Sequence, residues 1–243
     1  MGPDALPAAE VLIEAARPVE APSPTVPVEA PSPNFGPRRD GARPDIVVIH
    51  HTGMESAEAA LARLCDPAAE VSCHWLIAED GRVWRLVDEA LRAWHAGAGA
   101  WGDAGDVNSR SIGIELANPG PLAGFPPFPE PQMAALERLL AGILGRWAIA
   151  PARVIAHSDM APGRKTDPGP KFDWCRLARS GLAVWPEPVA GAAPCWDAFQ
   201  AAAGRFGYPA GPDLLAAFRL RFRPHASGSL AAEDVALAEG LRA

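Results

Sequence analysis

The 243-residue sequence lacks several features that would place it at a membrane or on nucleic acid. No apolar run approaches the ~18 residues of a membrane span, and the first residues contain neither the basic nor the apolar segment of a signal peptide. The net charge of -7 gives no clustered Lys and Arg for nucleic acid or an anionic membrane. Neither is an expected partner. The sequence as written predicts a cytoplasmic protein, or a periplasmic or outer-membrane protein if a leader was removed before residue 1.

Cysteine is also scarce. The four cysteines are scattered, and no two have Cys-x-x-Cys spacing, which excludes a disulfide framework and a thiolate zinc knuckle. We expect all four to be reduced thiols. A hydrophobic content of 49% with 21% charged residues is ordinary for a globular protein and provides enough apolar surface for a packed core.

Proline divides the chain into three parts. Residues 1–34 contain Pro-Val-Glu-Ala-Pro-Ser-Pro twice, at 18–24 and 27–33, and proline denies this segment a regular hydrogen-bond ladder. We therefore expect an extended or disordered tail. A second Pro-rich stretch near residue 190 separates a main domain, 35–190, from a C-terminal segment, 191–243.

The main domain alternates strand and helix signals. Asp80-Gly81 between two β-prone runs predicts a hairpin, so the sheet should be mixed rather than wholly parallel. The fold class is thus α/β, with a central mixed β-sheet flanked by helices. The predicted elements are strands at 46–50, 74–78, 82–86, 111–116 and 154–155, and helices near 55–65 and 131–147.

The C-terminal segment carries three short amphipathic patterns and predicts a small three-helix module. At roughly 50 residues such a module is near the lower limit of independent stability, so it should dock on the main domain. The apolar positions are Trp196, Phe199 and Phe206; Leu214, Leu215, Phe218 and Phe222; and Leu237 and Leu241.

Two histidines close apolar strands. His50 ends the run that begins at Ile46, and His157 follows Val154-Ile155, so both side chains should reach the same edge of the sheet. Asp167 lies ten residues later in a turn-rich loop, where it is either a third ligand or a turn residue before proline. Three N and O ligands leave the fourth tetrahedral position of Zn²⁺ open, as in hydrolytic zinc sites.

A carboxylate and a cation accompany this predicted zinc site. In the strand 111–116, Glu115 lies opposite the apolar face, which is costly unless it lines a cleft, so it is the candidate general base. Its structural alternative is an ion pair with Arg110. Lys165 lies on the same side of an extended loop as Asp167 and could stabilise an oxyanion, or it could be a solvated loop lysine.

The other histidines carry weaker signals. His95 follows Trp94 in a segment rich in small residues, which suits a loop lining a substrate site and equally a stacked structural pair. His51 and His74 are weaker candidates, and His225 lies in a loop without supporting neighbours.

Five ordered blocks resemble the type 2 N-acetylmuramoyl-L-alanine amidases, the zinc family that includes AmpD, AmiD and the peptidoglycan recognition proteins. The resemblance spans roughly residues 31–187, and a weaker one links Phe199-Gln200 and Gly207-Tyr208 to three-helix peptidoglycan-binding modules. Cys73 and Trp75 depart from the usual pattern of the family. The blocks are Val48-Ile-His-His-Thr52, Val71-Ser-Cys-His-Trp-Leu-Ile77, Arg92-Ala-Trp-His-Ala-Gly97, Asn108-Ser-Arg-Ser-Ile-Gly-Ile-Glu115 and His157-Ser-Asp-Met-Ala-Pro-Gly-Arg-Lys-Thr-Asp-Pro-Gly169.

The resemblance implies an enzyme that cuts the amide between N-acetylmuramic acid, or its anhydro form, and L-alanine of peptidoglycan stem peptides, in cell-wall recycling or remodelling. It implies Zn²⁺ on His50, His157 and Asp167, with Glu115 as base and Lys165 at the oxyanion. An aspartate as the third ligand, here Asp167, resembles the bacterial recycling and remodelling enzymes of the family. Implied substrate contacts are Trp94, His95, Asn108 and Arg164.

The competing interpretation is a recognition module that binds peptidoglycan without cutting it. Recognition needs neither an open metal position nor a base, so the complete set of candidates favours the enzyme. The sequence does not choose between anhydro-muropeptide fragments and intact sacculus as substrate. It also leaves open whether the C-terminal module binds glycan or only braces the fold.

Overall fold

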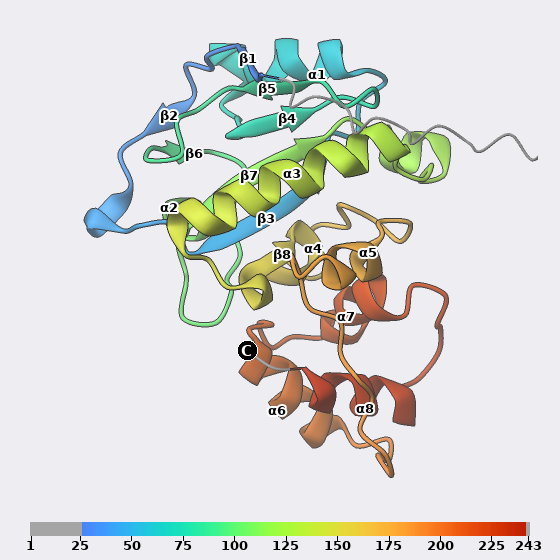
Figure 1. The fold of residues 1–243 in the computed structure, drawn as a ribbon. Helices are drawn as coiled ribbons and strands as arrows, with labels where there is room; N and C mark the ends of the chain where they lie inside the picture. Colours follow the sequence, from blue (N-terminus) through green and yellow to red (C-terminus); the bar gives the residue numbers. More distant parts are fainter. Residues whose placement is uncertain (1–25, 242–243) are drawn as a thin grey trace, which may run out of the picture.

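A mixed six-stranded sheet forms the centre of the computed structural model, which describes residues 26–241 (Figure 1). The strand order is β1-β5-β4-β7-β3-β8; β4 and β5 are antiparallel, and every other neighbouring pair is parallel. The predicted fold class and hairpin are thus confirmed. The strands are β1 (Val28–Glu29), β3 (Ile46–His51), β4 (Trp75–Ile77), β5 (Val83–Arg85), β7 (Ser111–Leu116) and β8 (Val154–Ala156).

One face of this sheet is covered by the long helix α3 (Glu130–Trp147). Alternate residues of β3 as far as Ile49, and alternate residues of β7, point toward it and are fully buried. The polar Gln132 is buried there too, where its Nε2 donates to the carbonyls of Ile77 and Ala117, both at 2.9 Å. The apolar residues of this interface include Val47, Ile49, Ile112, Ile114, Leu116, Met133, Leu136, Leu140 and Ile143.

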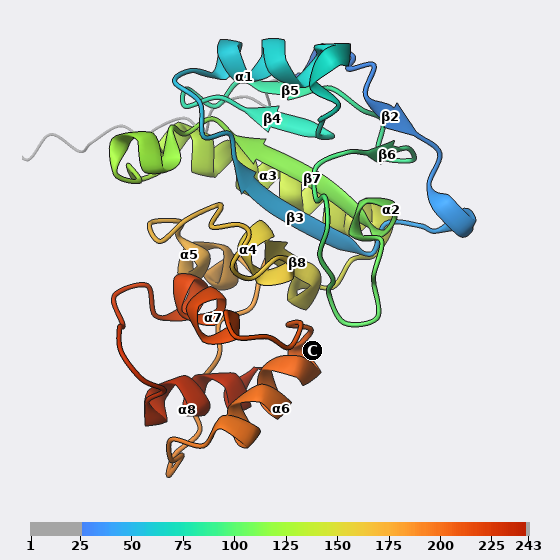
Figure 2. The same ribbon diagram turned by 180° about the vertical axis from the view of Figure 1, so that it is seen from behind.

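The opposite face carries α1 (Ala57–Leu64) at one end and the C-terminal module at the other (Figure 2). The hydroxyl of Ser56 caps α1 by accepting from the amide of Ala59 at 3.1 Å. Short elements complete the domain: β2 (Phe35–Gly36) paired with β6 (Arg92–Ala93), α2 (Val107–Arg110), α4 (His157–Met160), α5 (Trp174–Arg179), and the 3-10 helices Arg39–Gly41, Pro67–Ala69, Gly120–Ala123 and Pro151–Arg153.

The Pro-rich segment joins the domain earlier than the predicted boundary at residue 35. Residues 1–25 lie outside the described part of the chain, but β1 pairs with β5, and the Ser32 hydroxyl donates to the carbonyl of Leu64 at 2.5 Å. Asn34 is 3% exposed and donates to the carbonyl of Asp66 at 2.8 Å. A two-residue strand fits between prolines 27 and 31 because only those few backbone groups enter the ladder.

The C-terminal module contains α6 (Trp196–Phe206), α7 (Leu214–Phe222) and α8 (Ala232–Gly240). It lies against the β8 edge of the sheet in both views (Figures 1 and 2). Its core is continuous with the main domain, because Phe199 and Phe218 belong to the same apolar cluster as Val48 and Trp101. The predicted docking is therefore present.

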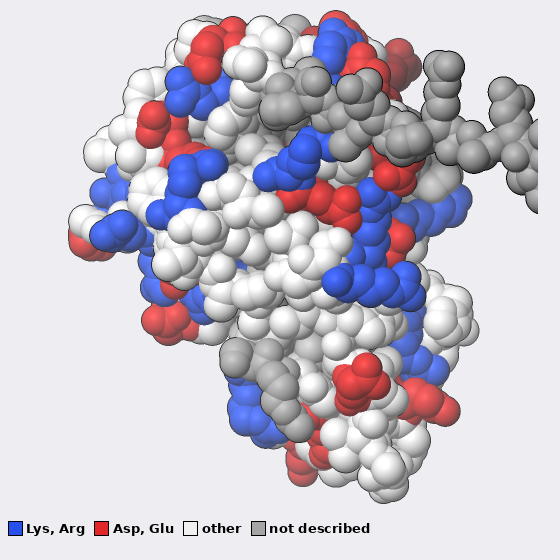
Figure 3. Space-filling model, viewed as in Figure 1, with Lys and Arg blue, Asp and Glu red and all other residues white. Residues whose placement is uncertain are grey.

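The surface of the described residues carries charged side chains of both signs. Basic and acidic side chains are interspersed over the face drawn in Figure 3. Several form ion pairs between elements, such as Arg176 of α5 with Glu137 of α3 at 2.9 Å. Within residues 26–241, no helix has the length and apolarity needed to cross a membrane.

Candidate active site

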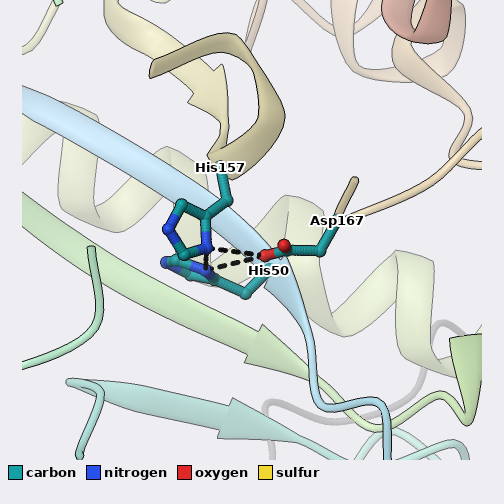
Figure 4. A group of neighbouring side chains, drawn as sticks. All are labelled: His50, His157 and Asp167. Carbon is teal, nitrogen blue, oxygen red and sulfur yellow. Dashed lines mark hydrogen bonds and ion pairs between the residues drawn. The ribbon is translucent and has the colours of Figure 1, made fainter. Parts of the chain in front are cut away.

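Three side chains converge at the carboxyl end of β3 (Figure 4). β3 and β8 are parallel with Ile49 opposite Ala156, so the next residue of each chain, His50 and His157, emerges at the same edge. The Nδ1 atoms of the two histidines are 2.9 Å apart, and Asp167 Oδ2 lies 3.0 Å from the first and 2.9 Å from the second. The loop is held there because the Ser158 amide donates to the Asp167 carbonyl at 3.0 Å.

Hydrogen bonds on the far side of each ring assign the tautomers. His157 Nε2 lies 2.8 Å from the carbonyl of Ala96, an acceptor only, so Nε2 carries the proton and Nδ1 presents a lone pair. For His50 the assignment passes through two further residues. Ser111 Oγ donates to the Val107 carbonyl at 2.6 Å, so it accepts from His95 Nε2 at 3.1 Å.

That leaves His95 Nδ1 as an acceptor, and it lies 3.0 Å from His50 Nε2. His50 therefore donates through Nε2 and, like His157, presents the lone pair of Nδ1 to the cluster. Gly113 makes this chain of hydrogen bonds sterically possible, because a Cβ there would lie 2.5 Å from the His95 ring. Outer partners of this kind fix the tautomer and ring orientation of metal-binding histidines.

The donor set fits a divalent cation. The ligand atoms of His50, His157 and Asp167 all lie within 4.8 Å of one another, and all three residues are buried. Burial and the neighbouring His157 lower the pKa of His50 to about 4, so it is neutral. Two imidazoles and one carboxylate match the ligand set of catalytic zinc.

Glu115 stands beside this cluster, opposite His50 in the register of β7 and β3. Burial and the Asp167 carboxylate raise the pKa of Glu115 to about 8, while Lys165 acts to lower it. Its Oε2 is buried without a hydrogen-bond partner among the described residues. The ion pair with Arg110 does not form, because Arg110 binds Asp45 through Nε at 2.7 Å and Nη2 at 2.5 Å.

A cavity of about 320 Å³ joins these groups. It is lined by the three candidate ligands, by Glu115 and by the half-buried Lys165. Trp94 and His95 line it as well, as expected for residues near a substrate. The remaining wall comes from His51, Thr52, Met54, Ala60, Arg63, Leu64, Val71 and Ser72.

Two predicted substrate contacts are not among the residues that line this cavity. Asn108 is 7% exposed, and its Oδ1 accepts from the amides of His95 at 3.0 Å and Ala96 at 2.8 Å. Arg164 donates to the carbonyls of Ala96, at 2.7 Å, and Ala98. In this structure both side chains hold the 95–98 segment in place, so direct contact with substrate stays a prediction for them.

The weaker histidine candidates separate by environment. His74 is a satisfied core residue: its Nδ1 accepts from the Gly113 amide at 2.9 Å, and its Nε2 lies 3.1 Å from the Leu91 carbonyl. His51 lines the cavity, and neither of its ring nitrogens has a partner in the described chain.

Sequence reasoning missed Ser111 and Arg63. Ser111 has a readable signal, because it shares the strand face of Gly113 and Glu115 at a spacing of two. Arg63 has none, since an exposed arginine on α1 is ordinary until α1 is placed over the cavity.

Comparison with known proteins identifies close similarity over most of the chain. Residues 40–170 match the family model of N-acetylmuramoyl-L-alanine amidases. The chain is 39% identical over 227 residues to N-acetylmuramoyl-L-alanine amidase AmiD of Escherichia coli (strain K12), covering 81% of each protein.

Solved structures with a similar fold include the following two. The complex of E. coli AmiD with the substrate anhydro-N-acetylmuramic acid-L-Ala-D-gamma-Glu-L-Lys has a TM-score of 0.75 at 38% identity, covering 82% of this chain and 88% of that chain. AmpDh3 from Pseudomonas aeruginosa in complex with anhydromuramic pentapeptide has a TM-score of 0.74 at 30% identity, covering 84% and 92%.

Proposed function

The chain belongs to the N-acetylmuramoyl-L-alanine amidase family and is an amidase of that kind, and we propose that it works with a zinc ion held by His50, His157 and Asp167. The bond cut is the amide between N-acetylmuramic acid, or its anhydro form, and L-alanine of the peptidoglycan stem peptide. The observation that carries the zinc proposal is the convergence of two fixed Nδ1 lone pairs and one carboxylate oxygen beside Glu115.

When bound, zinc supplies Lewis acidity toward the scissile carbonyl and lowers the pKa of water. Glu115 accepts the proton of the attacking water and returns it to the leaving nitrogen. Its pKa of about 8 falls when a cation is nearby, because positive charge favours the carboxylate. The same group is thereby a base in the loaded site and an acid after it has taken the proton.

Lys165 and the cavity walls complete the proposal. Lys165 lines the cavity with the candidate ligands and donates to the oxygen that becomes negative as water adds to the carbonyl. Trp94 and the half-buried His95 form the wall along which the substrate lies. His95 also supports His50, so its replacement would change more than substrate contact.

The direct test is mass spectrometry of products from purified protein. Anhydro-muropeptide and intact sacculus are each incubated with untreated protein, chelator-treated protein, and chelator-treated protein given zinc back. Chelator-sensitive release of free stem peptide is expected, and the better substrate separates fragment recycling from wall remodelling. Zinc binding with no release from either substrate would instead identify a recognition module.

The compartment is a separate part of the proposal. We propose a cytoplasmic enzyme that acts on fragments, with an exported enzyme acting on the wall as the alternative. Fractionation of cells that express the native full-length gene tests the two, because each places the protein in a different fraction.

A further inference from the structure

One buried carboxylate links the C-terminal module to the main domain. Asp159 in α4 is fully buried, and it receives hydrogen bonds from two side chains of the module. Arg221 Nη1 donates to its Oδ2 at 2.8 Å, and the Tyr208 hydroxyl donates to its Oδ1 at 2.6 Å. Both side chains of the ion pair have no exposed surface.

The same carboxylate fixes the backbone that presents His157. Asp159 Oδ2 accepts from the amide of Ala156 at 2.9 Å, which closes the first turn of α4 around the candidate ligand. His157 is the first residue of that turn, two positions before Asp159. A displacement of Asp159 is therefore transmitted through two peptide units to the residue that carries the imidazole.

Apart from its bond to Asp159, the Arg221 guanidinium is surrounded by aromatic rings. Its guanidinium lies 4.0 Å from the centre of the Trp174 ring and 4.9 Å from that of Phe222. Its Nε and Nη2 atoms are buried without a hydrogen-bond partner in the described chain. Removing one member of such a pair leaves an uncompensated buried charge, which is far more disruptive than losing an exposed pair.

We propose that the C-terminal module positions the metal centre, with Arg221 and Tyr208 holding Asp159 and Asp159 holding the turn that carries His157. The inference rests on the proposed function, because it takes His157 as a ligand. The module thereby contributes to metal affinity whether or not its outer surface binds glycan. Arg221 and Tyr208 are positioning residues that touch neither substrate nor metal.

The chain offers a matched control on the same helix. Arg219 is also buried, and its Nη2 donates to Asp234 at 2.6 Å and to the Ser229 carbonyl at 2.7 Å. These partners all belong to the module. Loss of Arg219 thus disturbs the module as a folded unit, whereas loss of Arg221 disturbs its bond to α4.

The experiment compares the zinc affinity of full-length wild type, Arg221→Met and Arg219→Met by competition with a chromophoric chelator. Thermal unfolding of the metal-free proteins reports stability in parallel. Outer partners of metal ligands change affinity by one to two orders of magnitude, so we expect about tenfold weaker zinc binding for Arg221→Met and less than about twofold for Arg219→Met.

Tyr208→Phe keeps the test available if Arg221→Met does not fold. It removes a single hydroxyl and should weaken zinc binding in the same direction by a smaller factor. Wild-type affinity in both the Arg221 and Tyr208 variants would overturn this inference and leave the zinc amidase standing. Equal weakening by Arg219→Met would also overturn it, since the effect would then be general loosening. No zinc binding by wild type would overturn the zinc proposal itself.

Discussion

The two faces of the central sheet are built from the same two strands but serve different purposes. Odd-numbered residues of β3, such as Val47 and Ile49, pack with Ile112 and Ile114 of β7 beneath α3. On the opposite face of the same two strands, His50 of β3 and Glu115 of β7 line the cavity. Because strand residues alternate, one face supplies burial beneath α3, whereas the other packs Val48 against the C-terminal module and carries the chemical groups near its end. Substitutions on the two faces should therefore separate stability from activity.

The largest expected effect is on the chemical face. Glu115→Gln keeps the size of the side chain but removes the base, so kcat should fall by about 100- to 10,000-fold. Zinc affinity should change much less, because Glu115 is not among the three clustered ligand residues. Stem-peptide release is measured by mass spectrometry and bound zinc by chelator competition. Turnover at the wild-type rate would remove Glu115 from the mechanism.

The matching change on the apolar face is Leu136→Ala. Leu136 is fully buried between α3 and the sheet, and truncation should lower the free energy of unfolding by about 2–5 kcal/mol. At a temperature where the variant is folded, its kcat should remain near the wild-type value, because no atom of Leu136 lines the cavity. Denaturant unfolding and turnover on the same preparation check this. A loss of kcat comparable to that of Glu115→Gln would show that the faces are not separable.

The buried Glu115 also gives this face a distinctive pH dependence in the metal-free protein. Its pKa is about 8 in the fold and about 4.3 in an unfolded chain, so between these values the unfolded state releases a proton that the native state keeps. Stability then falls as pH rises, by at most about 1.4 kcal/mol per pH unit from this one group.

Histidine titration must be kept out of that measurement. The pKa of His50 is lowered to about 4, so it contributes stability that rises with pH up to about 6.5, the opposite sign. Denaturant unfolding of chelator-treated wild type and Glu115→Gln between pH 6.5 and 8 isolates the carboxylate. The wild type should lose stability relative to the variant across this window, and bound zinc should shrink the difference. Parallel curves would contradict the raised pKa.

Local patterns in the sequence specified most of the fold but only part of the site. The strand 111–116 and the helix near 131–147 were predictable because each shows its own periodicity, and the hairpin because Asp80-Gly81 marks its turn. The strand β1 was not predictable, because a two-residue strand between prolines has no side-chain pattern.

The site also divides into residues that local sequence patterns predicted and residues whose roles they did not. His50, His157 and Asp167 each follow a local signal, and the structure brings all three together. The roles of His95 and Arg221 depend on contacts with residues 45 and 62 positions away in the chain. No pattern in a single sequence encodes such pairings, so the sequence predicted His95 only as part of a loop that lines a substrate site, or as a stacked structural pair with Trp94.

The smallest expected effect tests the hydrogen-bond chain behind His50. Ser111→Ala removes the group that accepts the proton of His95 Nε2. His95 can then carry its proton on Nδ1 instead, where that proton would face the proton on His50 Nε2 and break the hydrogen bond between the two rings. We expect about tenfold weaker zinc binding. Ser109→Ala is the control, because its hydroxyl donates to Asp106 at 2.9 Å, outside this chain. Equal affinity of the two variants would mean that packing of the surrounding side chains, rather than the position of the His95 proton, sets the orientation of His50.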